Sequence, residues 1–165
     1  MKIHELLKHN KYETLYHISF KSDLEGIWKP KNPINEGIDT EPELPRISCA
    51  PTIEQCFQAI YPNISNLFEE QNRPDLKFYV YSPVLDGSEH ILYPEQLTKQ
   101  HIVHDAHMTD EVCILDPVFM KLVMKIKIMN TNKNSFIKYR PWDNPNRNEK
   151  DFAPTNIKYK ILKTY

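Results

Sequence analysis

An alternating stretch, MKLVMKIKI at residues 120–128, restricts the fold more than any other part of the sequence. Its even-numbered positions are all Met, Leu or Ile, and three of the four positions between them are lysine. Side chains of a β-strand point alternately to the two faces of a sheet, so the pattern predicts a strand with one buried and one solvated face. The chain must therefore build a sheet that is covered on one side only.

Further strands are predicted from short runs rich in β-branched and aromatic residues. IKYKIL near the C-terminus repeats the lysine alternation, and TLYHIS, RISCA, KFYVYSPV and EVCIL are bounded by polar or proline-containing loops. Together these runs predict six or more strands in a mixed, mostly antiparallel sheet.

Helices are predicted to be few and short. In TIEQCFQAIY, Thr52 is suited to the N-cap and Gln55 follows three residues later, which is the spacing of a capping box; Pro62 ends the helix. IHELLKH and NISNLFEEQ are predicted to form two more short helices, and the proline-rich residues 30–45 a long surface loop. The fold class is therefore α+β, with residues 1–165 expected to form a single domain.

Composition narrows the setting of the protein. The chain of 165 residues is 40% hydrophobic and 26% charged, as globular domains are. It has no apolar run of roughly 20 residues and no apolar signal-peptide core after Met1, so we expect no membrane segment. Three cysteines without paired spacing indicate reduced thiols. We therefore expect a cytoplasmic protein.

Charge is distributed unevenly along the chain. Residues 119–165 hold 11 Lys and Arg against 3 Asp and Glu, whereas residues 1–118 hold 10 basic and 19 acidic residues. Such a division indicates either a surface for nucleic acid or an acidic partner, or two halves of one fold that face each other. The second interpretation is the simpler one.

Several chemical templates do not fit. The three glycines, Gly26, Gly37 and Gly87, form no phosphate-binding loop, and no Gly-x-Ser-x-Gly turn is present. Cys49 and Cys56 are predicted to be structural. His101, His104, His107 and Asp105 supply potential metal ligands, but their spacing matches no closed zinc pattern. We expect an exposed polar loop there and no metal site.

Three segments in order carry a resemblance to a known family. LYHIS is a strand with a histidine near its end, RISCAPTIEQCFQAI a strand leading into a capped helix, and TDEVCIL a strand that begins at a glutamate. This order resembles the ADP-ribosyltransferases of the poly(ADP-ribose) polymerase and diphtheria-toxin branch, over residues 15–128 discontinuously. The resemblance implies a split β-sheet and NAD as the substrate.

The resemblance also implies roles for individual residues. His17 would bind the adenosine-side ribose of NAD, the backbone of Ile18 would hold the nicotinamide carboxamide, and Ser19 takes the place of the family's small hydroxyl residue. Glu111 would be the catalytic carboxylate, which binds the nicotinamide-ribose 2′-hydroxyl and stabilises an oxocarbenium-like centre. Ser48 replaces the family's first tyrosine.

Other positions depart from the family. Isoleucine stands at position 18 where the family has glycine, and Ala59 is near the place of the family's second tyrosine; Tyr61 or Phe57 would supply the missing aromatic surface. Taken singly, His17 is also compatible with a satisfied core histidine, and Glu111 with an edge-strand charge that discourages aggregation.

Three functions therefore remain open. The first is transfer of ADP-ribose from NAD to a protein or nucleic-acid acceptor, with residues 87–110 as the loop that selects the acceptor. The second is a non-catalytic module of the same fold that binds a nucleotide, RNA or a host protein. The third is an RNA-directed protein that uses Lys125 and Lys127. The Lys- and Asn-rich, Gly-poor composition suits a bacterial or phage accessory protein.

Overall fold

The computed structural model describes residues 12–33, 42–60, 74–104, 106–129 and 158–165. The helices predicted for IHELLKH and NISNLFEEQ lie outside these ranges, as does part of the proline-rich loop. No helix in the described part of the chain has the length and apolar content needed to cross a membrane.

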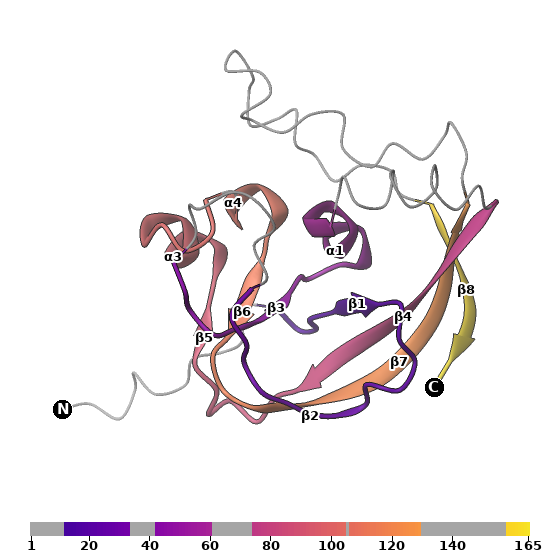
Figure 1. Ribbon diagram of the computed structural model, residues 1–165, viewed down its shortest axis with the longest axis horizontal. Coiled ribbons are helices and arrows are strands. Elements are labelled where there is room, and N and C mark those ends of the chain that lie inside the picture. Colours follow the sequence, from indigo (N-terminus) through magenta and orange to yellow (C-terminus); the bar gives the residue numbers. More distant parts are fainter. Residues whose placement is uncertain (1–11, 34–41, 61–73, 105, 130–157) are drawn as a thin grey trace, which may run out of the picture.

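A larger sheet is built around one long strand, β7, which extends from Val118 to Met129 (Figure 1). β4 pairs along one edge of β7, and β2 and β8 share the other edge, so the order is β1-β4-β7-β2 with β8 also on β7. The strands are β1 (His17–Ser19), β2 (Gly26–Trp28), β4 (Asp75–Val84) and β8 (Tyr159–Thr164). Every one of these pairs is antiparallel.

A smaller antiparallel sheet has the order β3-β6-β5. Its strands are β3 (Ile47–Cys49), β5 (Ile91–Leu92) and β6 (Val112–Ile114). The two sheets meet where Tyr16, just before β1, exchanges two backbone hydrogen bonds of 2.8 and 2.9 Å with Ala50, just after β3. A second bridge pairs Lys31, after β2, with Arg46, before β3, so the β-structure is split into two sheets joined by isolated bridges.

Helix α1 (Ile53–Ile60) covers the inner side of the larger sheet. Its residues Ile53 and Phe57 pack with Ile18, Phe78 and Ile126 in one core cluster, where the rings of Phe57 and Phe78 meet edge to face at 5.0 Å. A second cluster fills the space between the two sheets and is formed by Leu15, Ile47, Cys49, Tyr81, Val112, Ile114, Val118 and Met120.

The segment at residues 87–110 differs from the loop that the sequence predicts. It contains β5 and two short helices, α3 (Pro94–Lys99) and α4 (Ala106–Thr109). Leu97, Ile102, Val103 and Ala106 are buried and form a third core cluster with Cys113. His101 and His104 are exposed in the turn between α3 and α4, as expected, but Ile102 and Val103 beside them are buried and anchor the segment over the smaller sheet.

The strands predicted from the β-rich runs are confirmed as β1, β3, β4, β6, β7 and β8. The capped helix is confirmed too: the Thr52 hydroxyl accepts a hydrogen bond from the Gln55 backbone N–H at 3.2 Å. β2 and β5, of three and two residues, were not predicted.

Candidate functional site

A pocket of about 80 Å³ opens at the junction of the two sheets, between β1, β3 and the start of α1. It is lined by Tyr16, His17, Ile18, Ser48, Cys49, Ala50, Gln55, Cys56, Thr109 and Glu111. Whole small molecules generally occupy pockets of roughly 300–1,000 Å³. This pocket therefore holds one ring-sized group and leaves the rest of a larger ligand outside.

Strand register places the carboxylate of Glu111 beside Ser48 and Cys113. Ser48 and Cys113 are opposed residues of β3 and β6, so their side chains share a face of the smaller sheet. Glu111, two residues before Cys113, lies on the same face, and the Cys113 thiol contacts Glu111 Oε1 at 3.8 Å. Glu111, which directly precedes β6, thus faces the pocket.

The His17 imidazole, beside the same pocket, is fixed by two contacts. Its Nδ1 lies 2.8 Å from the backbone oxygen of Ser48, and its ring meets that of Trp28 edge to face at 4.9 Å. Burial lowers the pKa of His17, and the Ser48 carbonyl opposes that effect only partly. The ring is therefore neutral near pH 7, and because a carbonyl only accepts, Nδ1 carries the proton and Nε2 is an acceptor.

The backbone of Ile18 faces the same opening. Successive residues of a strand turn their N–H and C=O groups to opposite edges. Tyr16 directs both groups to Ala50, so Ile18, two residues later, directs its own groups to that same edge, beyond the bridge. A donor and an acceptor of the main chain are thus presented beside the pocket.

Gln55 and Asp110 hold helix α1 against the strand that carries Glu111. The Gln55 amide donates to Asp110 Oδ2, while its Oε1 accepts a 2.8 Å bond from the Thr52 hydroxyl. Asp110 follows α4 and has a positive φ of 52°, a conformation in which Asp and Asn are enriched. Asp110 therefore has a structural role, as a helix-ending residue and an acceptor for Gln55.

The thiols around the pocket are not suited to nucleophilic chemistry. Burial raises the pKa of Cys56 to about 12, with further contributions from Glu54 and Glu111. Burial also raises the pKa values of Cys49 and Cys113, and the Glu111 charge adds to both. Because the thiolate is the reactive form, these cysteines are packing residues, as the sequence predicts for Cys49 and Cys56.

Four of the residues predicted for the site are brought together: His17, Ile18, Ser48 and Glu111 all line the pocket. Ser19 is not among the lining residues, and its hydroxyl accepts the Lys21 N–H at 3.2 Å within a local turn. Tyr61 lies outside the described residues.

Tyr16, Gln55 and Thr109 line the pocket without having been predicted. Tyr16 directly precedes His17. Gln55 was predicted only as a member of the capping box of α1, not as a residue of the site. Their position depends on contacts between segments far apart in the sequence, such as the Tyr16–Ala50 bridge and the Gln55–Asp110 bond.

The histidine segment has separate local contacts. The rings of His101 and His104 are 5.9 Å apart, and His107 Nδ1 lies 3.3 Å from the Thr98 hydroxyl. Within the described ranges, no group of three or more His, Cys, Asp or Glu side chains is arranged to hold a metal ion.

Comparison with known proteins gave no match: no family model, no curated protein and no solved structure is significantly similar to this chain.

Proposed function

We propose that the pocket binds the nicotinamide end of NAD and that the protein transfers ADP-ribose to a protein or nucleic-acid acceptor. The observation that carries the proposal is the convergence of a neutral His17, the outward backbone of Ile18 and the Glu111 carboxylate on one opening. These residues come from two segments far apart in the sequence, β1 and the start of β6, and the sequence resemblance assigns each of them to NAD. The proposal concerns activity and ligand; the fold supports it only at the level of an antiparallel split sheet.

Each residue has a chemical task that suits its surroundings. The Ile18 N–H and C=O match the acceptor and donor of a carboxamide. His17 Nε2 accepts a hydrogen bond from a ribose hydroxyl. Glu111 supplies negative charge in a partly enclosed site, where charge stabilisation is stronger than in water.

The reaction breaks the glycosidic bond between ribose C1′ and the nicotinamide nitrogen, and the bonding electron pair leaves with nicotinamide. Positive charge then develops on the ribose, and the Glu111 carboxylate stabilises it. An acceptor nucleophile forms the new bond to C1′ and releases its proton to solvent. In place of the tyrosines that Ser48 and Ala59 replace, Tyr16 is the tyrosine among the described lining residues.

Nicotinamide release from NAD by the purified protein, with cell lysate as a source of acceptors, tests the proposal. We expect Glu111→Gln to lower release about 10²–10³-fold, the usual effect of removing one charge-stabilising group. Glu43→Gln is the matched control, because Glu43 is exposed and away from the pocket. Absence of release together with absence of NAD binding in calorimetry would refute the proposal.

A second candidate is a non-catalytic module of the same fold that binds a nucleotide, RNA or a host protein. The small volume of the pocket and the serine at position 48 favour it, since both reduce the contact surface for nicotinamide. NAD binding that is unchanged in Glu111→Gln, with no turnover in either protein, would identify this candidate.

A further inference from the structure

The outer side of the larger sheet carries a patch of lysines, opposite the side covered by α1. Leu76 and Phe78 of β4 and Ile126 and Ile128 of β7 face α1 in the core. The residues that alternate with them face the other way. This lysine face consists of Lys77, Lys125, Lys127, Lys160 and Lys163.

Strand register arranges these lysines in two rows that cross the sheet. In one row, Lys77, Lys127 and Lys160 are opposed residues of β4, β7 and β8. In the other, Lys125 is opposed to Tyr79 on β4 and to Lys163 on β8. Opposed side chains in neighbouring strands have Cβ atoms about 4.5–5.5 Å apart, so like charges here repel each other.

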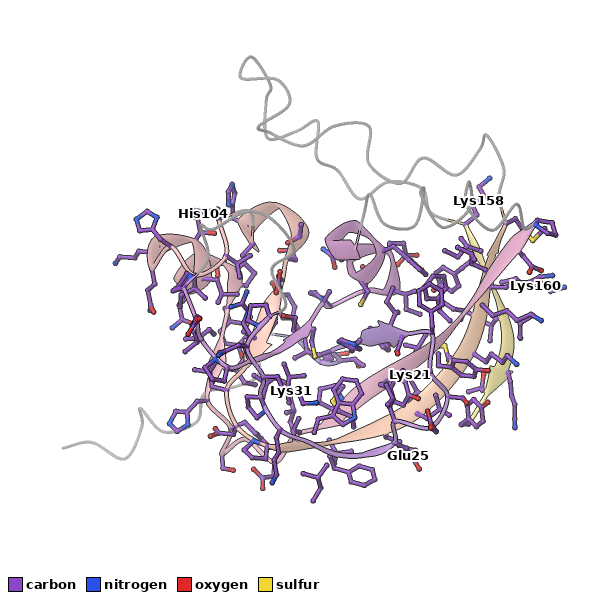
Figure 2. The ribbon with its side chains drawn as sticks, in the orientation of Figure 1. Lys21, Glu25, Lys31, His104, Lys158 and Lys160 are labelled. Atoms are coloured by element: carbon purple, nitrogen blue, oxygen red, sulfur yellow. The ribbon has the colours of Figure 1, made fainter. Side chains whose placement is uncertain are left out.

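Little negative charge offsets this repulsion. Asp75 is the one acidic residue in the sequences of β4, β7 and β8, and it lies 3.6 Å from Lys127. Lys77, Lys160 and Lys163 are exposed. Figure 2 shows Lys160 on β8 projecting away from α1. The repulsion between these exposed ammonium groups is relieved when an anion binds to them.

Aromatic rings accompany the ammonium groups. Lys125 Nζ is 5.4 Å from the centre of the Tyr79 ring, and Lys163 Nζ is 4.3 Å from that of Tyr165, whose side chain is 47% exposed. Sheet faces that combine cations with exposed rings bind single-stranded nucleic acids, because phosphates pair with the cations and bases stack on the rings.

We propose that the lysine face binds single-stranded nucleic acid, with phosphates on the lysines and a base on Tyr165. An acidic peptide would satisfy the charges but would make no use of the exposed tyrosine ring. The proposal does not depend on the proposed function, since the lysine face and the pocket lie on different parts of the molecule and share no residue.

Fluorescence anisotropy of labelled oligouridylate and oligothymidylate tests the proposal at two salt concentrations. The combined variant Lys77→Gln, Lys125→Gln and Lys160→Gln should bind at least about tenfold more weakly at low salt. Its slope of log K against log salt should be smaller by about 2, because each lost contact to a single strand contributes about 0.7. Tighter binding of oligouridylate would indicate RNA and tighter binding of oligothymidylate would indicate DNA. Binding of either one supports the proposal.

A matched control removes the same charge elsewhere. Lys29, Lys31 and Lys99 are exposed and outside the lysine face, so changing all three to Gln should leave affinity within about twofold, apart from a general effect of net charge. Equal weakening in both triple variants, or no binding to wild type, would overturn the proposal.

Tyr165→Leu separates nucleic acid from an acidic protein. Stacking of one base on an aromatic ring is worth about 1–3 kcal/mol, so affinity for the oligonucleotide should fall about fivefold or more. Polyglutamate of equal charge should compete poorly. If polyglutamate competes as well as the oligonucleotide and Tyr165→Leu has no effect, the face binds acidic proteins and the proposal is refuted.

Discussion

The Nδ1 atom of His17 lies 2.8 Å from the backbone oxygen of Ser48, and this hydrogen bond connects the larger sheet to the smaller one beside the pocket that both residues line. It fixes the tautomer of His17 and also the distance between the walls that His17 and Ser48 form.

Lowering the pH should destabilise the protein through His17. Its pKa is lowered below 6.5, mainly by burial, whereas the unfolded chain titrates near 6.5. Below that pH the unfolded state therefore binds the proton first, and the free energy of unfolding falls as pH drops from about 6.5 through the folded pKa. Above about 6.5 the effect vanishes. Urea unfolding of wild type at about pH 7.5 and about pH 5 measures it.

His17→Asn is the matched variant for this experiment, because its side-chain amide still donates to the Ser48 carbonyl but does not titrate. The variant should lose part of the pH dependence of stability seen in wild type. Identical pH profiles for the two proteins would contradict the assignment of a depressed pKa to His17.

Removing the Gln55 side chain should destabilise the fold by about 1–3 kcal/mol. Gln55→Ala leaves the half-buried Asp110 carboxylate without this donor and breaks the capping box with Thr52. Chemical denaturation measures the loss. Gln100→Ala is the control, because Gln100 is exposed at the end of α3, and its effect should stay within about 0.5 kcal/mol. A Gln55→Ala effect no larger than the control's would show that Asp110 does not need this bond.

Thiol labelling should be slow in the native protein. Cys49, Cys56 and Cys113 are buried and have raised pKa values, so almost no thiolate is present at neutral pH. Reaction with a chromogenic disulfide should therefore follow unfolding and accelerate in denaturant, where all three thiols react at once. Rapid labelling of one thiol under native conditions would indicate local opening at the pocket.

Local sequence patterns predicted the parts of the fold that local forces determine. The alternation at residues 120–128 gave β7, which extends only a few residues further, and the capping box gave the start of α1. In both, the signal lies within one element and repeats with its period.

Elements stabilised by distant contacts were not predictable in this way. α3 has six residues, begins with Pro94 and has one central apolar residue, Leu97, so its helical pattern is too short to recognise. Its stability comes from burial of Leu97 against Ile102 and Cys113. Prediction of the site was limited in the same way by distant contacts. The types of its residues were recognisable from the sequence, but the Gln55–Asp110 bond joins positions 55 residues apart.

The edge that β8 occupies has a consequence for synthesis of the chain. β7 ends at Met129 and β8 at Thr164, so the ribosome adds 35 residues between the two events. At about 5–20 residues per second, that edge of β7 waits about 2–7 s for its partner strand. During this interval Lys125 and Lys127 keep like-charged neighbours apart, since charged residues on an open edge oppose pairing with other nascent chains. The same lysines thus protect this edge of β7 before β8 is added.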